Sequence, residues 1–361
     1  MWLFSKHIDL AALYLPIWLC WMVLFNLPSE YLQADIPLWV WVLFVLCIDV
    51  GHVWSTIFRT YLDKEEFREH KTLLMVAPLI SFVVVATIAF ISTFWFWRLL
   101  AYLALFHFVK QQYGFLALYK MKAQDFGIKK IFQDKWVLYL ATLYPVVYWH
   151  FAEGLYFSWF VTNDFINLRS LFDISSRFWV LFFQPLNILY WLIIIAWTVE
   201  EWQRSHKVNT GKILWMLTTA INWYVGIVYF NSDLAFTVTN VVAHGIPYLT
   251  LIIYYQYQKK GIKGDGLTTA YRVAAAILPV VFFLGWLEEY FWDMLIYGDR
   301  GYFFGAVIAY PFDLLQSPLA QAIGIGCLAL PQLTHYIIDG FIWKSNESNP
   351  YVRQIFKNGS K

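Results

Sequence analysis

Charged residues are scarce in this chain. Asp, Glu, Lys and Arg make up 14% of its 361 residues, while apolar residues make up 60% and the mean hydropathy is +0.54. An average soluble domain is about 25% charged and about 45–50% apolar. The shortage of charge therefore excludes an ordinary soluble domain and predicts an all-α, polytopic integral membrane protein. The net charge of +2 arises from basic residues in short connections, which indicates no nucleic-acid partner.

Cysteine is rare and several catalytic motifs are missing. The three cysteines lie inside apolar stretches without CxxC spacing, at Cys20, Cys47 and Cys327. The sequence therefore predicts neither a disulfide framework nor a thiolate metal site, and we expect all three to be small core residues. The chain also lacks a glycine-rich phosphate loop and a GxSxG elbow, so nothing supports nucleotide-driven transport or serine hydrolysis.

Aromatic residues, in contrast, are abundant at 21% of the chain, with 20 Trp, 24 Tyr and 32 Phe. Belts of aromatic residues at the two membrane surfaces account for many of them. Their number exceeds what the belts need. We therefore also expect aromatic side chains to line an apolar interior that binds a lipid or another apolar small molecule.

Apolar stretches of roughly 20 residues recur along the chain, which is the length a helix needs to cross about 30 Å of hydrocarbon. We find no internal repeat, low-complexity tract or soluble domain, and we predict a single transmembrane domain over residues 1–361 with short loops. The ten predicted spans are 8–27, 37–58, 73–93, 97–119, 136–157, 178–199, 213–231, 234–257, 273–292 and 319–341.

The connections between these spans differ in their basic residues. Lys and Arg number 21 in the N-terminal arm, the C-terminal tail and the connections after the even-numbered spans, against four in the opposite set. Because basic residues favour the cytoplasmic side, both termini are predicted to be cytoplasmic, in a multi-pass protein of the bacterial inner membrane. The outer connections 158–177 and 293–318 are expected to fold over the membrane surface as interfacial segments.

Four of the predicted spans carry a histidine, and two of them add a carboxylate one helical turn away. Residues three or four apart share one face of a helix, and an ionisable pair inside a membrane is costly unless it is paired, hydrated or bound to a metal. These residues are Asp49 and His52 in 37–58, His107 in 97–119, His244 in 234–257, and His335 and Asp339 in 319–341.

All four spans are predicted to run from the outer side to the cytoplasm. Each histidine follows the start of its span by 10 to 16 residues, which at about 1.5 Å per residue places all four between the bilayer centre and the cytoplasmic side. We therefore expect the six side chains to meet around one site. Imidazole and carboxylate ligands suit iron, manganese or zinc, and six of them suit a two-metal centre like those inside four-helix bundles.

Polar residues near the histidines are candidates for a supporting role. Gln111 follows His107 by one turn and Asn240 precedes His244 by one turn, so each is expected to orient an imidazole. Arg59, nearer the cytoplasm, could hold an anionic headgroup or could simply extend towards water.

Each of these residues also has a purely structural interpretation. A single intramembrane histidine is often an interhelical hydrogen-bonding residue, and this alternative stays open for His107 or His244 taken alone. Four histidines that share depth and direction favour a joint role. His150 and Glu153 form a further pair, but in a span of opposite direction, where we expect a hydrogen bond. Glu288 ends a span near the outer surface and is expected to face water.

The sequence resembles known families in arrangement more than in motif. The ending H-Y-x-x-D-G-x-I-W-K at 335–344 resembles a signature of polytopic bacterial membrane proteins. Histidines spread over several spans are similar in arrangement to the bacteriorhodopsin-related β-carotene dioxygenase family. Ceramidase and PAQR-like hydrolases also bury His and Asp, although their late HxxxH is replaced here by His335-x-x-x-Asp339. The HxxxH and HxxHH boxes of membrane desaturases are missing.

These features together predict a metal-dependent membrane enzyme that acts on a lipidic substrate. The leading chemistry is oxidation by iron, with the four histidines as ligands, Asp49 and Asp339 bridging or completing the coordination, and an electron donor as a further partner. In the alternative, zinc activates a water molecule with Asp49 or Asp339 as general base, which gives a lipid hydrolase. A third hypothesis is a transporter that moves protons or a metal ion through the buried His and Asp residues.

Overall fold

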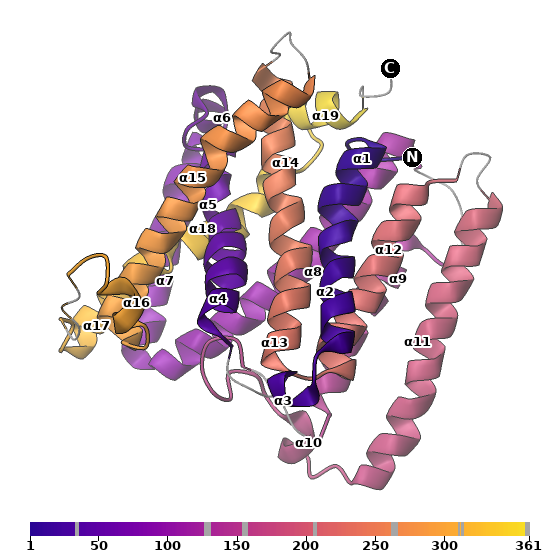
Figure 1. The fold of residues 1–361 in the computed structure, drawn as a ribbon, viewed down its shortest axis with the longest axis horizontal. Helices are drawn as coiled ribbons and strands as arrows, with labels where there is room; N and C mark the ends of the chain where they lie inside the picture. The colour runs from indigo at the N-terminus through magenta and orange to yellow at the C-terminus, as the bar shows by residue number, and fades with distance from the viewer. Residues whose placement is uncertain are drawn as a thin grey trace. The chain divides into compact units, whose positions relative to one another are not determined.

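The computed structural model describes residues 1–32, 36–125, 131–153, 158–204, 208–260, 266–309, 311 and 314–357 (Figure 1). Within these ranges the chain forms helices and no strand, so the predicted all-α class is confirmed. Five lysines of the predicted cytoplasmic set lie outside the described residues: Lys129, Lys130, Lys207, Lys263 and Lys361.

Each predicted span overlaps helical structure over most of its described residues. Several helices contain a π-helical stretch, labelled η, that continues directly into or out of an α-helix. The long helical stretches are α1 (Lys6–Ile8) with η1 (Asp9–Tyr14) and α2 (Leu15–Asn26), α4 (Leu38–Val40) with η2 (Trp41–Val50) and α5 (Gly51–Arg59), α7 (Lys71–Ile91), α8 (Thr93–Ala123), α9 (Asp134–His150), α11 (Ser176–Arg204), α12 (Thr210–Trp223) with η3 (Tyr224–Tyr229), α13 (Asp233–Phe236) with η4 (Thr237–Val241) and α14 (Val242–Lys260), α15 (Gly266–Trp292) with η5 (Asp293–Tyr297), and α17 (Pro318–Leu328) with α18 (Leu330–Ile342).

Short helices occupy the connections. They are α3 (Ser29–Leu32), α6 (Lys64–Glu69), α10 (Leu168–Leu171), α16 (Gly301–Phe304) and α19 (Pro350–Lys357). α10 and α16 lie within the two outer connections. The predicted span 136–157 was too long at its end, because α9 stops at His150 and is followed by turns.

Six of the described helical stretches are long and apolar enough to cross a membrane. α17 and α18 together would make a seventh, bent by 43° at Ala329. Pro331 lies in the first turn of α18, where its missing N–H is tolerated and the preceding helix cannot continue straight. These helices fit a multi-pass membrane protein.

The chain folds as two compact units. Unit 1 comprises residues 1–38, 101–247 and 353–361, and unit 2 comprises residues 39–100 and 248–352. The helices α8 and α14 each contribute residues to both. Within unit 1, α9 packs against α11, α12 and η3, around a core that includes Phe108, Trp149 and Trp223.

Within unit 2, α15 packs against η2 and α5, and α7 packs against α17 and α18. The approach of α15 is close because Gly285 faces the second half of η2. A Cβ atom on Gly285 would lie 3.1 Å from the carbonyl oxygen of Leu46, so a larger residue would require Leu46 to shift by a few tenths of an ångström.

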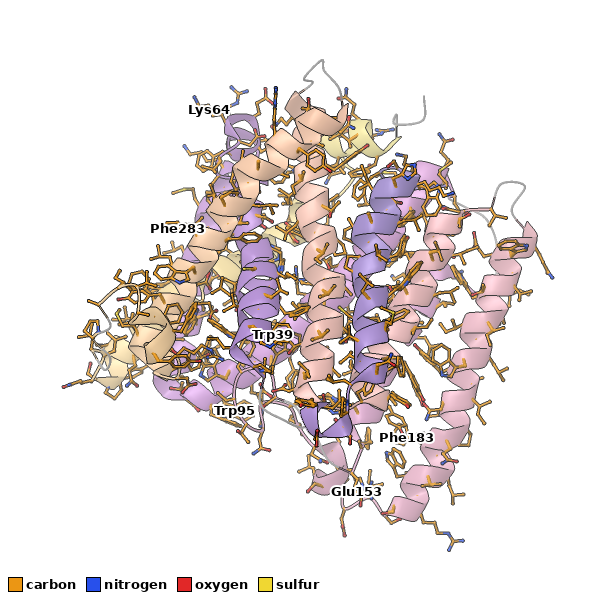
Figure 2. The ribbon with its side chains drawn as sticks, in the orientation of Figure 1. Trp39, Lys64, Trp95, Glu153, Phe183 and Phe283 are labelled. Carbon is orange, nitrogen blue, oxygen red and sulfur yellow. The ribbon has the colours of Figure 1, made fainter. Side chains whose placement is uncertain are left out.

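The outward faces of the long helices are apolar. Phe283 on α15 is 59% exposed and projects away from the other helices of unit 2 (Figure 2). Trp39 and Trp95 are likewise exposed. Such side chains would be unfavourable in water but suit contact with lipid. The cysteines are all free, and only Cys20 is buried; Cys327 is exposed, so the expectation of a core position is wrong for it.

Candidate functional site

Unit 2 brings together two of the four histidines. His52 lies in the first turn of α5, directly after η2, and His335 lies in the middle of α18. Both side chains are about 1% exposed. Their rings meet edge to face with centroids 5.0 Å apart and planes at 77°, and each offers a ring nitrogen within 4.8 Å of the other.

Each of these histidines has a carboxylate on its own helix, at the spacing that the sequence indicated. Asp49 Oδ1 lies 3.7 Å from His52 Nδ1, and Asp339 Oδ1 lies 3.6 Å from His335 Nδ1. These separations exceed hydrogen-bond length. The carboxylates therefore make no direct hydrogen bond to the imidazoles, and other groups make the hydrogen bonds to the rings.

Two hydroxyl groups complete this set in unit 2. Thr56 Oγ1 lies 2.7 Å from His335 Nδ1 and 3.0 Å from the hydroxyl of Tyr248, and Tyr248 donates a hydrogen bond of 2.6 Å to Asp339 Oδ1. The sequence reasoning missed both residues. A signal was present, because Thr56 follows His52 by four residues and therefore shares its helical face.

Unit 1 brings together the other two histidines. His107 on α8 is 6% exposed and His244 on α14 is fully buried. Their ring centroids lie 5.1 Å apart at 83°, and each offers a ring nitrogen within 4.8 Å of the other. The ring of Phe108 stacks on His244 with centroids 3.7 Å apart and planes at 17°, so an aromatic surface fixes the plane of this imidazole.

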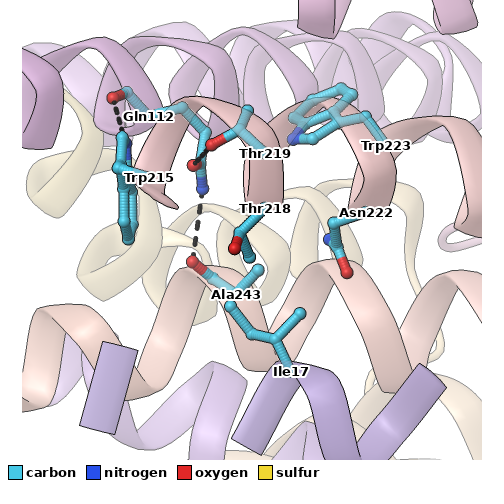
Figure 3. A pocket seen from close by; sticks show the side chains of 8 residues that line it. All are labelled: Ile17, Gln112, Trp215, Thr218, Thr219, Asn222, Trp223 and Ala243. Atoms are coloured by element: carbon cyan, nitrogen blue, oxygen red, sulfur yellow. Dashed lines mark hydrogen bonds between the residues drawn. The ribbon is translucent and has the colours of Figure 1, made fainter. Parts of the chain in front are cut away.

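Amide side chains surround this second pair. Gln111 Nε2 donates to the main-chain oxygen of His244 at 3.1 Å, and Gln112 Nε2 donates to that of Ala243 at 3.2 Å. A helical carbonyl normally accepts from the N–H four residues later, but Pro247 has none. Gln112 therefore supplies the hydrogen bond that Pro247 removes from Ala243, one residue before the histidine (Figure 3).

Gln112 is itself held on both sides. The hydroxyl of Thr219 donates to its side-chain oxygen at 2.8 Å, and Trp215 donates to its main-chain oxygen at 3.0 Å. The crevice beside these residues in Figure 3 is too narrow for a water molecule. The polar side chains around it are packed together and position α14, and we assign no ligand to the crevice.

Asn240, the second predicted supporting residue, lies within η4. Its side-chain oxygen accepts from Asn222 at 3.4 Å, and its nitrogen donates to the Thr239 hydroxyl at 3.1 Å. The predicted supporting residues thus bond to backbone or to other polar side chains. In both units a π-helical stretch ends just before a histidine, at Val50 and at Val241. Such stretches are rare and occur frequently at functional sites.

Four other charged or polar residues occupy places that bear on the predictions. His150 pairs with the Tyr102 hydroxyl at 2.8 Å and with the Val146 carbonyl at 2.8 Å, which is the hydrogen-bonding role that we expected. Glu153, its proposed partner, is exposed and lies 3.9 Å from Arg169.

The expectation for Glu288 is wrong. Its side chain is buried and accepts a hydrogen bond of 2.6 Å from Trp54 Nε1. The reason is that the helix does not end at Trp292 but continues through η5 to Tyr297. Glu288 therefore lies more than two turns from the helix end.

The expectation for Arg59 is also wrong. Its guanidinium is fully buried, forms an ion pair with Glu66, donates to the Ile342 carbonyl at 3.1 Å and lies 4.3 Å from the Tyr255 ring centre. A headgroup could reach it only by displacing Glu66. Arg59 is a structural residue of unit 2.

Comparison with protein-family models, with curated proteins and with solved structures gave no match. The chemistry of the two histidine pairs must therefore be argued from their own geometry.

Proposed function

We propose that this chain is an integral-membrane, metal-dependent oxidoreductase that uses iron to oxidise a lipid or another apolar molecule. The observation that carries the proposal is the buried pair of edge-to-face histidines in each unit. Two neighbouring imidazoles that are withdrawn from water inside apolar helices form a ready-made pair of metal ligands, since neutral imidazole is the commonest metal ligand in proteins.

The joint role of the two pairs rests on the sequence. The four spans that carry His52, His107, His244 and His335 have one predicted direction and place them at similar predicted depth. Together the four imidazoles suit iron, with zinc as the alternative metal, and Asp49 is a further ligand candidate. Two iron ions per chain would match the number of nitrogen and carboxylate donors.

The proposed substrate class follows from the lipid bilayer that would surround the helices. An apolar chain can reach a buried centre directly from the bilayer, while the surrounding aromatic residues exclude water. Oxygen would serve as the oxidant. Oxidative cleavage of a double bond places both oxygen atoms in the products, whereas hydroxylation or desaturation also consumes an electron pair and therefore requires an electron donor as a partner.

We also propose that all ten predicted spans cross the membrane and that both termini are cytoplasmic, in the bacterial inner membrane. The support is the asymmetry of Lys and Arg between the two sets of connections. Green fluorescent protein fused to the C-terminus should fluoresce, and alkaline phosphatase at the same place should be inactive. The reverse result would overturn the assigned orientation.

Elemental analysis of protein purified in mild detergent, without added metal, tests the enzymatic proposal. We expect about two irons per chain and oxygen consumption when an apolar substrate is supplied. Near-stoichiometric zinc would overturn the oxidoreductase and favour a zinc-dependent lipid hydrolase with Asp49 or Asp339 as general base. No metal, either as purified or after reconstitution, would overturn the metal centre and favour a proton-coupled transporter or a structural polar network.

A further inference from the structure

We infer that Asp339 acts on His335 through the hydroxyls of Tyr248 and Thr56, and that this chain of hydrogen bonds selects the tautomer in which His335 Nε2 can bind a metal. The role in metal binding rests on the proposed function, whereas the hydrogen bonds themselves do not depend on it. It assigns a positioning role to Thr56 and Tyr248, and it makes Asp339 an orienting group instead of a metal ligand.

The chain consists of three short contacts within unit 2. The Tyr248 hydroxyl donates to Asp339 Oδ1 at 2.6 Å, Thr56 Oγ1 lies 3.0 Å from that hydroxyl, and His335 Nδ1 lies 2.7 Å from Thr56 Oγ1. The side chain of Asp339 is 10% exposed, and the other three residues are at most 4% exposed. All four side chains are therefore largely withdrawn from the surface of unit 2.

The direction of each hydrogen bond follows from counting protons. The Tyr248 hydroxyl donates to Asp339 Oδ1, so its single proton points towards Asp339. Tyr248 must then accept from Thr56, whose single proton is used in that bond. Thr56 has only lone pairs left for His335, and the imidazole must therefore donate from Nδ1.

This direction determines which ring nitrogen is available to a metal. A neutral imidazole that carries its proton on Nδ1 presents a lone pair at Nε2, which is the atom that binds metal. The direct distance between Asp339 Oδ1 and His335 Nδ1 is 3.6 Å, too long for a hydrogen bond. The two hydroxyls bridge this gap, so that Asp339 determines through them which nitrogen of the imidazole carries the proton.

Two neighbouring contacts agree with this assignment. Trp343 Nε1 lies 3.4 Å from the Tyr248 oxygen, and because an indole can only donate, it leaves the Tyr248 proton for Asp339. His52 Nδ1 lies 3.3 Å from the carbonyl of Ile48, which only accepts. Both histidines of unit 2 therefore carry their proton on Nδ1.

Nitrogen NMR of the metal-free protein with 15N-labelled histidine tests the tautomer directly. The His335 signals are identified by their loss in His335→Gln. We expect the Nδ1–H tautomer in the wild type and a mixture of tautomers in Tyr248→Phe, because Thr56 is then able to donate to the ring. An Nε2–H tautomer in the wild type, or an unchanged tautomer in Tyr248→Phe, would overturn the inference.

Titration with Co(II), followed by its absorption bands, tests the consequence for binding. Thr56→Val removes the hydroxyl at nearly constant shape and should weaken Co(II) binding about 10- to 100-fold, while Thr56→Ser should restore it. The matched controls are Thr60→Val and Tyr255→Phe, which remove buried hydroxyls bonded to the Thr56 carbonyl and to Glu66. They should bind Co(II) like the wild type.

The outcomes separate this inference from the proposed function. Normal Co(II) binding by Thr56→Val, or a failure of Thr56→Ser to recover, would overturn the positioning role and leave the metal centre standing. A wild-type protein with the Nδ1–H tautomer that binds neither Co(II) nor iron would support the hydrogen-bond chain and overturn the metal centre.

Discussion

The two histidine pairs share a geometry and differ in what surrounds them. In both, the rings meet edge to face with centroids about 5 Å apart. The pair in unit 2 has two carboxylates, Asp49 and Asp339, and hydroxyls that reach an imidazole. The pair in unit 1 has amides that bond to the main chain and a phenylalanine ring stacked on one imidazole.

This difference separates two ways of positioning a ligand. A carboxyl oxygen that accepts a hydrogen bond at one end of a chain of hydroxyls fixes the position of the proton on the imidazole at the other end. An amide both donates and accepts, so it imposes no direction on a proton, but it can satisfy a carbonyl that a proline has left without a donor. We conclude that hydrogen bonds between side chains order the pair in unit 2, whereas packing and backbone contacts order the pair in unit 1.

The largest expected effect concerns the need for both pairs. His335→Ala and His244→Ala each remove one imidazole from a different unit, and we expect each to abolish iron retention after purification. His7→Ala, which changes an exposed histidine, should retain the wild-type iron content. If one of the two variants kept its iron, the histidine pair of a single unit would suffice to hold iron. The prediction that both pairs are needed would then be wrong.

The second prediction concerns the charge in unit 2. Asp339→Asn keeps the shape but introduces a donor, so the direction of the hydrogen-bond chain is no longer imposed. We expect metal affinity to fall about 10- to 100-fold, measured by competition with a chelator. Glu153→Gln, which changes an exposed carboxylate, is the control. Equal affinity in Asp339→Asn and the wild type would show that the carboxyl acceptor does not distinguish the two pairs.

The third prediction concerns the backbone contact in unit 1. Gln112→Leu leaves the buried carbonyl of Ala243 without a donor, which should cost about 1–3 kcal/mol of unfolding free energy. In a Pro247→Ala background the helix regains an N–H at position 247, and the same substitution should cost less. Denaturant unfolding in detergent measures both values. An equal cost in the two backgrounds would contradict the role assigned to Gln112.

The last prediction tests the boundary of the site, because the smallest effect on iron content is expected here. Tyr102→Phe removes the hydrogen bonds to His150 and to the Ile166 N–H and should destabilise the protein by about 0.5–1.5 kcal/mol per bond. Iron content should stay at the wild-type level. A loss of iron without a loss of stability would show that His150 belongs to the metal set after all.

Helical periodicity predicted the parts of the site that lie on one helix. Asp49 and His52 are three residues apart, His335 and Asp339 are four apart, and each carboxylate lies within 4 Å of its histidine. Composition and hydropathy likewise predicted the all-helical class and the approximate positions of the described long helices, but not the break at Ala329. These features depend on residues that are close together in the sequence, so the sequence alone indicates them.

Contacts between helices could not be predicted in the same way. Spacing along the chain does not reveal which histidine meets which, and it does not show that Thr56 reaches His335 instead of its own neighbour His52. Glu288 was misplaced because a π-helical stretch prolongs its helix. Arg59 was misplaced because Glu66, on the next short helix, folds back against it.

The separation of the pairs along the sequence has a consequence for biosynthesis. The hydrogen bond from Gln111 to His244 joins residues 133 positions apart, and that between Thr56 and His335 joins residues 279 apart. At a synthesis rate of about 5–20 residues per second, Thr56 must wait roughly 15 to 55 seconds for its partner to emerge. During that interval the nascent chain holds Asp49 and His52 inside apolar helices without the second half of their unit. A membrane insertase or chaperone that shields this half would act within this interval.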